Sequence, residues 1–153
     1  QTAYQVTSLL EGVIKRGTGK KLRDLNLNLA GKTGTTNENT DTWFIGFTSN
    51  LVIGVYVGMD NPYPLGKFET GSKTALPIFK KFVKEAVKKS DARPFKVSKG
   101  ITMMVIDPLT GQKAKFSSTK TILEAYKSKN VVEGKILYSN NYRLGINNIL
   151  RFY

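Results

Sequence analysis

Apolar and polar residues alternate along three consecutive stretches, at residues 25–36, 42–48 and 51–58. A period of two, with many β-branched residues in the third stretch, is typical of β-strands. The apolar side chains of the second stretch share one face: Trp43, Ile45 and Phe47. The links are short, and residues 49–50 suit a two-residue turn. The pattern therefore predicts an antiparallel meander of three strands.

Three glycines lie inside these predicted strands, at Gly34, Gly46 and Gly54. Glycine weakens a strand interior, so it marks a place where another group must come close. We interpret Gly34 as room for a substrate backbone that lies along the first strand. Gly46 and Gly54 are interpreted as room for helices that pack on the sheet.

Two other stretches repeat apolar residues every three or four positions, as amphipathic helices do. The first covers residues 3–15 and ends at Gly17 and Gly19. The second begins near Thr74, a favourable N-cap residue, with Pro77 in its first turn. Its predicted buried face consists of Ala75, Ile78, Phe79, Phe82, Val83, Ala86 and Val87. With the meander, these helices indicate an α+β fold, an antiparallel sheet flanked by helices.

The last third of the chain has a different pattern. Residues 101–106 and 112–116 suit two strands joined by a turn that contains Pro and Gly. Residues 121–129 suit a short helix, because Thr121 and Glu124 have the spacing of a capping box. We therefore predict a β-hairpin followed by a short helix.

The helix that begins near Thr74 is followed by a linker, which divides the chain. We expect one part over residues 1–94 and a small β-rich tail over residues 95–153. Residues from 130 onward are rich in Asn and Tyr, and their pattern assigns no element.

The amino-acid composition excludes several kinds of catalytic group. The chain has 153 residues without cysteine or histidine, so disulfides, thiolate catalysis and imidazole bases are excluded. We expect no metal and no cofactor. No apolar stretch reaches the ~18 residues that span a bilayer.

The net charge is +13, from 24 basic and 11 acidic residues. The lysines are spread along the chain, and no nucleic-acid module accompanies them. We therefore favour a solvated basic surface, or one that faces an anionic lipid or polymer, and expect no nucleic-acid partner.

The triplet Gly31-Lys32-Thr33 has two interpretations. As the end of a phosphate-binding loop it needs a glycine at Asn26 and a helix afterwards, and the chain offers neither. As a Lys-Thr-Gly element it needs an extended segment, which the alternation around Lys32-Thr33-Gly34-Thr35 predicts. The flanks favour the second interpretation.

The order of several motifs then resembles one family. An Arg-Gly-Thr-Gly loop at residues 16–19 precedes the Lys-Thr-Gly-Thr-Thr-Asn strand, a Trp-Phe-x-Gly strand and a Gly-x-x-x-Gly-x-Asp strand. In this order they resemble the C-terminal part of the transpeptidase domain of class A, bifunctional penicillin-binding proteins. The resemblance covers residues 1–94, extends into "GITMMVIDPLTGQKA" and fades after about residue 129.

The resemblance implies a partial penicillin-binding or β-lactamase-like transpeptidase fold and a D-alanyl-D-alanine transpeptidase. A serine attacks a peptidoglycan stem peptide, the acyl-enzyme passes to an amine on a neighbouring strand, and β-lactams acylate the same serine. It gives Lys32 and Thr35 catalytic roles, Lys32 as a fixed charge and the Thr35 N–H as an oxyanion donor. Thr33, Gly34 and Thr36 would bind substrate.

The resemblance also implies location and partners. The implied protein lies on the extracytoplasmic face of the bacterial inner membrane, in the periplasm, anchored by a segment upstream of this sequence. Its partners are peptidoglycan stem peptides, β-lactams and the upstream part of its own transpeptidase domain.

The sequence departs from the family in its nucleophile. A Ser-x-x-Lys and a Ser-x-Asn motif should precede Lys32, and neither does. Ser117 and Lys120 fit the first spacing, and residues 139–141 fit the second, but both follow Lys32. Ser117 lies in an expected exposed turn, so we expect a fragment that lacks its nucleophile and is inactive alone.

Two other functions remain open: a β-lactamase-related serine hydrolase fragment, and a non-enzymatic basic module that binds peptidoglycan or nucleic acid. The resemblance also implies that the strand matching residues 51–58 pairs with a strand from the start of the domain, which this sequence does not include. Residues 51–57 would then leave an apolar, uncharged strand edge open, and we expect copies of the fragment to associate as a homo-oligomer.

Overall fold

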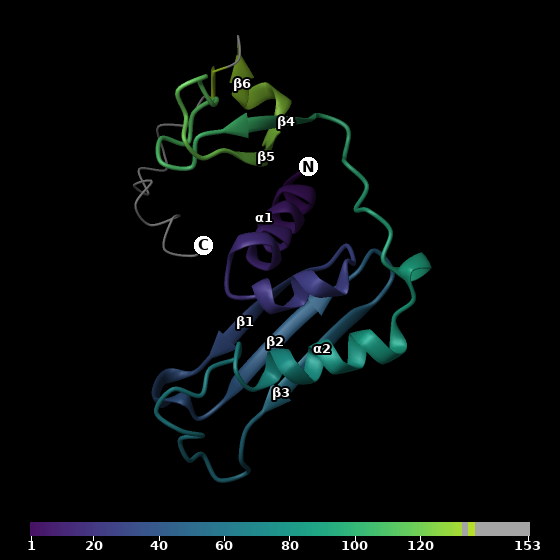
Figure 1. Cartoon of the computed structure of the whole chain (residues 1–153), viewed down its shortest axis with the longest axis vertical. Helices are drawn as coiled ribbons and strands as arrows, with labels where there is room; N and C mark the ends of the chain where they lie inside the picture. Colours follow the sequence, from purple (N-terminus) through teal and green to yellow (C-terminus); the bar gives the residue numbers. More distant parts are fainter. Residues whose placement is uncertain (133–134, 137–153) are drawn as a thin grey trace. The chain divides into compact units, whose positions relative to one another are not determined.

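The computed structural model describes residues 1–132 and 135–136 (Figure 1). It divides into two compact units, one of Leu10–Phe95 and one of Gln1–Leu9 with the chain from Lys96 onward. Helix α1 (Thr2–Arg16) belongs to both, since it begins in the second and ends in the first. The predicted helix over residues 3–15 is confirmed.

The larger unit carries a three-stranded sheet in the order β1-β2-β3. Its further elements are η1 (Lys20–Leu25), β1 (Ala30–Thr35), η2 (Asn37–Asn39), β2 (Thr42–Phe47), β3 (Val52–Val57), α2 (Ala75–Ala86) and η3 (Lys89–Asp91). Both strand pairs are antiparallel. A two-residue turn joins β2 to β3, with Thr48 N donating to Leu51 O over 2.9 Å. The predicted meander is confirmed, and α2 lies across one face of it (Figure 1).

The first strand is shorter than predicted. The alternation from Leu25 to Leu29 suggested a strand, yet η1 ends at Leu25 and β1 begins only at Ala30. Asn26 has a left-handed backbone, φ 51°, which an asparagine tolerates and which turns the chain out of η1. The apolar residues between them pack on the core without joining the ladder.

The core of the larger unit forms where β2 meets α2. Phe44 and Phe79 are fully buried, and their ring centroids lie 4.7 Å apart in an edge-to-face arrangement. A Cβ on Gly46 would come within 2.6 Å of Phe79 Cζ, so only glycine admits the Phe79 ring. The interpretation of Gly46 is confirmed, whereas that of Gly54 is wrong, because nothing lies within 4 Å of its Cβ position.

The buried face of α2 differs in part from the prediction. Ala75, Leu76, Phe79 and Val83 are buried, but Ile78 and Phe82 are about half exposed. Thr74 is the N-cap residue and forms no side-chain cap. Its hydroxyl instead donates to Thr70 O over 3.0 Å and lies 2.6 Å from the Thr42 hydroxyl, so it ties the helix start to the sheet.

The open face of the sheet is opposite α2. Trp43, Ile45 and Phe47 do share one face of β2, but Trp43 and Ile45 are exposed. The core-facing residues of this strand are Thr42, Phe44 and Gly46. Packing against α2, and not the larger apolar side chains, decides which face of β2 is buried.

The smaller unit contains a second antiparallel pair, β4 (Ile101–Ile106) with β5 (Ile122–Lys127). The predicted strand over residues 101–106 is confirmed. The predicted return strand over residues 112–116 is wrong: only one isolated bridge, between Ile106 and Lys113, forms there.

The helix predicted over residues 121–129 is also wrong, because β5 occupies most of it and is followed by η4 (Ser128–Asn130). Alternation puts Ile122, Glu124 and Tyr126 on the face that packs with Met104 and Ile106. Cross-strand burial therefore outweighs the capping-box spacing of Thr121 and Glu124. Two short strands follow, β6 (Val131–Val132) and β7 (Lys135–Ile136).

Within the described ranges, no helix has both the length and the apolar character to cross a membrane.

Replacing Gly46 by alanine should destabilise the fold by about 1–3 kcal/mol, because the new methyl group would overpack the Phe44 and Phe79 rings. Thermal unfolding at matched protein concentration measures the change. Gly54→Ala is the control: its Cβ position is empty, so we expect no loss, and a gain of up to about 1 kcal/mol. Equal destabilisation by both substitutions would contradict the packing account.

Candidate active site

The Lys-Thr-Gly segment forms most of β1, an outer strand of the sheet. Lys32 pairs with Ile45, Thr33 with Phe44, Gly34 with Trp43 and Thr35 with Thr42. In the strand order β1-β2-β3, β1 has one strand neighbour among the described residues. The other edge of β1 thus has the geometry to which an extended peptide adds as a further strand.

Strand alternation separates the side chains of this segment. Lys32 and Gly34 share the open face with Ile45 and Trp43, whereas Thr33 and Thr35 lie on the opposite face. A Cβ on Gly34 would come within 3.2 Å of Trp43 Cβ. The absence of a side chain at Gly34 therefore makes room for the Trp43 side chain of the neighbouring strand.

The Lys32 side chain bends toward Thr33, the residue that follows it. Its Nζ donates to Thr33 O over 2.9 Å and to Thr33 Oγ1 over 3.3 Å. The Thr33 hydroxyl also lies 3.1 Å from that of Thr18, in the loop before η1. An ammonium and two hydroxyls thus meet near the middle of the strand.

The Lys32 charge has no carboxylate counterpart. No carboxylate of the described residues lies within ion-pair distance of Lys32 Nζ, although the side chain is half buried. A partly buried, uncompensated ammonium attracts anionic groups more strongly than one in free solvent. The cluster of Lys32, Thr33 and Thr18 is therefore suited to a carboxylate or another oxyanion.

The loop before α2 holds the Thr35 side chain through a hydrogen bond. Gly71 N donates to Thr35 Oγ1 over 3.1 Å. A Cβ on Gly71 would come within 2.7 Å of Gly34 O and closer still to Trp43 O, so the loop reaches the strand only with glycine there. Because the Thr35 hydroxyl accepts this hydrogen bond, its own proton remains available to donate to a ligand.

Thr36 has a different local role. Its hydroxyl accepts a hydrogen bond from Asp41 N over 2.8 Å and lies 2.8 Å from the Thr40 hydroxyl. It thereby closes the turn that contains η2, where Glu38 and Asn39 have left-handed backbones. A substrate-binding role for Thr36 stays a prediction.

The same turn is fixed on the open face by Asp41. Tyr56 donates to Asp41 Oδ1 over 2.6 Å, and this hydrogen bond raises the pKa of Tyr56 above its usual value. The Tyr56 ring also packs on Trp43, with centroids 4.9 Å apart. The strand end near Thr35 therefore has two supports, the turn with its aromatic pair and the loop at Gly71.

Two residues of this arrangement were missed from the sequence, Thr18 and Gly71. The Arg-Gly-Thr-Gly loop is a motif of the sequence, but nothing in the pattern indicates that Thr18 meets Thr33. Gly71 follows a loop rich in Pro and Gly, and its contact with β1 depends on how α2 packs on the sheet.

The serine motif at Ser117 and Lys120 lies on an exposed segment, as the sequence predicts. Ser117 and Lys120 are both exposed and lie outside helices and strands. The neighbouring Ser118 donates to Asp107 Oδ2 over 3.2 Å. Residues 139–141 lie outside the described residues. In the part of the chain that the structure describes, no three residues among Asp, Glu, His and Cys gather as metal ligands would.

Comparisons with known proteins match this site segment. The family described as the penicillin-binding protein transpeptidase domain matches residues 1–84, which include all of β1. The chain belongs to the penicillin-binding protein transpeptidase family.

Individual relatives agree with the family. Penicillin-binding protein 1A of Rickettsia prowazekii is 48% identical over 128 residues, which are 84% of this chain and 16% of that protein. The protein of the same name from Pseudomonas aeruginosa is 42% identical over 130 residues, with the same two coverages. The crystal structure of penicillin-binding protein 1A from Haemophilus influenzae matches with a TM-score of 0.69 and 30% identity, over 80% of this chain and 20% of that one.

The chain thus spans about a sixth of the length of these relatives. The resemblance to penicillin-binding proteins and the α+β fold expected from it are both confirmed. The family match and the geometry coincide at β1, where Lys32 and Thr35 lie.

The Gly71–Thr35 hydrogen bond predicts a difference in amide hydrogen exchange. In Thr35→Val the buried Gly71 N–H loses its acceptor, so its exchange should accelerate roughly tenfold or more. NMR-detected exchange of the Gly71 amide measures this. Thr33→Val is the matched control on the same face of the strand and should leave Gly71 protected. Unchanged exchange in Thr35→Val would show that Thr35 does not hold the loop.

Proposed function

We propose that this chain contributes the Lys-Thr-Gly strand to a serine D-alanyl-D-alanine transpeptidase that cross-links peptidoglycan stem peptides and is acylated by β-lactams. The observation that carries the proposal is Lys32, a half-buried cation without a carboxylate partner among the described residues, beside the Thr33 and Thr18 hydroxyls. The segment that holds it is matched by the transpeptidase family.

The substrate is anionic where it meets this strand. A stem peptide ends in the carboxylate of D-alanine, and β-lactams carry a carboxylate at an equivalent place. Lys32 supplies the positive charge, and the Thr33 and Thr35 hydroxyls donate hydrogen bonds to that carboxylate. The Thr35 hydroxyl is free to do so because it accepts from Gly71 N.

The backbone of the strand has a second role in the proposal. The N–H of Thr35 donates to the carbonyl oxygen that gains negative charge when the serine attacks the penultimate D-alanine. Loss of one such donor typically costs about 10²–10³ in rate. In this proposal the substrate backbone lies along β1 past Gly34.

The nucleophile and its base come, in this proposal, from a part of the transpeptidase domain outside these 153 residues. No Ser-x-x-Lys motif precedes Lys32, and Ser117 is exposed outside any helix. The serine forms an ester with the donor peptide and terminal D-alanine leaves; an amine of a neighbouring strand then displaces the serine. The chain alone is therefore inactive.

The proposal includes the division of the chain and its place in the cell. Residues 1–94 form the C-terminal part of the transpeptidase domain, and residues 95–153 form a tail. The complete protein is anchored in the inner membrane and acts on its extracytoplasmic face, where its substrate lies. Relatives named penicillin-binding protein 1A support a transpeptidase over a β-lactamase.

In the complete transpeptidase, Lys32→Ala should slow acylation by penicillin by roughly 100-fold or more, because the uncompensated cation at the substrate carboxylate is lost. Stopped-flow or gel-based measurement of fluorescent penicillin uptake gives the rate. Lys81→Ala, an exposed lysine of α2, is the control and should change the rate less than twofold.

An unchanged acylation rate in Lys32→Ala, with the fold intact by circular dichroism, would refute the role of this strand. The 153-residue chain alone should take up no fluorescent penicillin. A covalent label on Ser117 would show that the nucleophile lies in the tail.

A further inference from the structure

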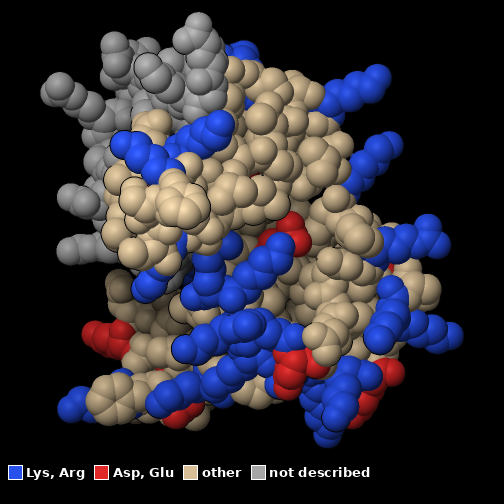
Figure 2. Space-filling view, turned by 45° about the horizontal axis from the view of Figure 1, so that its top comes forward, with Lys and Arg blue, Asp and Glu red and all other residues tan. Residues whose placement is uncertain are grey.

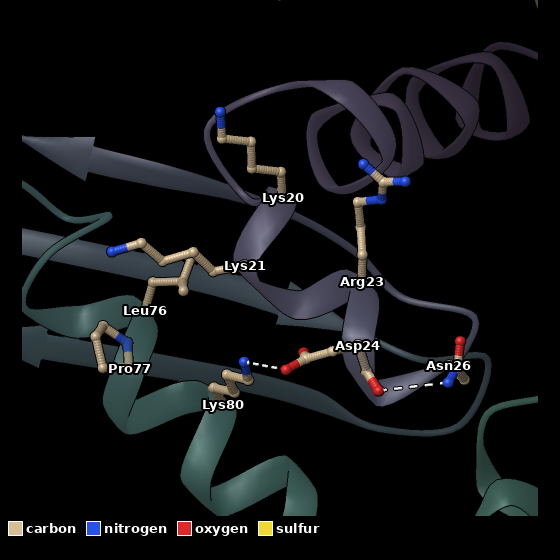
Figure 3. Close-up of a pocket in the computed structure, with 8 residues that line it drawn as sticks. All are labelled: Lys20, Lys21, Arg23, Asp24, Asn26, Leu76, Pro77 and Lys80. Atoms are coloured by element: carbon tan, nitrogen blue, oxygen red, sulfur yellow. Dashed lines mark hydrogen bonds and ion pairs between the residues drawn. The ribbon is translucent and has the colours of Figure 1, made fainter.

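A basic groove opens between η1 and the first turns of α2, away from the Lys-Thr-Gly segment (Figure 3). It is an open groove with a volume of about 830 Å³, and its charged lining residues are Lys20, Lys21, Arg23, Asp24 and Lys80. No residue of β1 lines it. The groove is therefore separate from the candidate active site.

The groove has a net positive charge, with one carboxylate against four cations. Asp24 pairs with Lys80 over 2.6 Å, and this hydrogen bond lowers the pKa of Asp24. Lys20, Lys21 and Arg23 have no carboxylate within ion-pair distance among the described residues. Three neighbouring charges on one short helix are thus left for an external anion.

The cations of the groove do not all extend toward one point. Lys20 and Arg23 extend from η1 in the same direction, as residues three apart in a 3-10 helix do. Lys21 extends over Leu76 instead, and Lys80 points to Asp24 (Figure 3). Because they do not converge on one point, they suit a polymer with repeated negative groups better than a single small anion.

Basic side chains also gather beyond the groove. Figure 2 shows that Lys and Arg side chains outnumber Asp and Glu side chains on the described surface that faces the viewer. Such a surface concentrates a polyanion near the protein and weakens in salt, since the Debye length is about 8 Å at 0.15 M ionic strength.

We propose that this groove is an exosite for the peptidoglycan strand, which it binds through the free carboxylates of stem peptides. The inference rests on the proposed function, because the polymer is then the substrate itself. Arg23 presents a planar fork that matches a carboxylate, and Lys20 and Lys21 contact carboxylates of other stems. The exosite holds the polymer while the active site processes one stem.

Binding of the full 153-residue chain to purified, insoluble peptidoglycan tests the exosite in a pelleting assay at 0.15 M salt. The double variant Lys21→Glu, Arg23→Glu should weaken binding roughly tenfold or more. The matched control Lys81→Glu, Lys89→Glu has the same change of net charge at exposed positions outside the groove, and should weaken it less than twofold. Amidation of the polymer's carboxylates should abolish the difference between wild type and the double variant.

A variant that should bind peptidoglycan more strongly distinguishes a change of charge from a loss of folding. Asp24→Asn removes the only carboxylate of the groove from an exposed position and should strengthen binding at least twofold. Equal losses in the groove and control variants, or undiminished binding to amidated peptidoglycan, would overturn the exosite. So would tighter binding to duplex DNA than to peptidoglycan with the same dependence on Lys21 and Arg23.

Different experiments would refute the exosite and the proposed function. In the complete transpeptidase, Lys21→Glu with Arg23→Glu should leave acylation by a small penicillin unchanged, because a soluble β-lactam needs no polymer contact. Conversely, an acylation rate unchanged by Lys32→Ala would refute the proposed function, whatever the groove variants do in the pelleting assay.

Discussion

The packing of Phe79 onto the bare backbone of Gly46 is the contact on which the larger unit depends. It lets α2 approach β2 closely enough that Phe44 and Phe79 are both fully buried. The position of α2 in turn fixes the loop before it, where Thr74 contacts Thr42 and Gly71 contacts Thr35. A hydrophobic contact in the core thereby fixes the position of the Thr35 hydroxyl, which faces the substrate in the proposed site.

Polar contacts of two kinds hold the strand. Near its middle, Lys32 and Thr33 meet Thr18, and the Lys32 charge stays uncompensated by any carboxylate of the described residues. At its C-terminal end, a backbone N–H of the loop donates a hydrogen bond to the Thr35 hydroxyl, which can still donate its own proton. This combination is suited to a carboxylate ligand, and it needs neither histidine nor cysteine, which the chain lacks.

Much of this fold follows from local patterns, because period-two and helical repeats report burial directly. The strands β2 and β3 and helix α1 were predictable for that reason, and the order of short motifs indicated the family. The predictions that were wrong concern details that depend on contacts between distant segments. Ile78 and Phe82 fit a helical apolar face, yet the sheet buries Leu76 in their place. Residues 121–129 carry a helix-start signal, yet pairing with β4 makes most of them a strand.

The candidate site likewise includes residues that local sequence patterns do not predict. Lys32 and Thr35 can be named as candidates from the sequence because the Lys-Thr-Gly motif consists of consecutive residues. Thr18 and Gly71 were missed because they approach β1 from segments before and after it, and only the packed sheet and helix reveal them.

The central claim is that Lys32, Thr33 and Thr35 recognise a carboxylate at the edge of β1. A crystal structure of the complete transpeptidase acylated by penicillin tests it most directly. The account predicts the penicillin carboxylate within about 2.5–3.2 Å of the Thr33 and Thr35 hydroxyls, with Lys32 Nζ beside it and the Gly71 N–H still bonded to Thr35. A carboxylate held by other residues, with both threonine hydroxyls uncontacted, would contradict it.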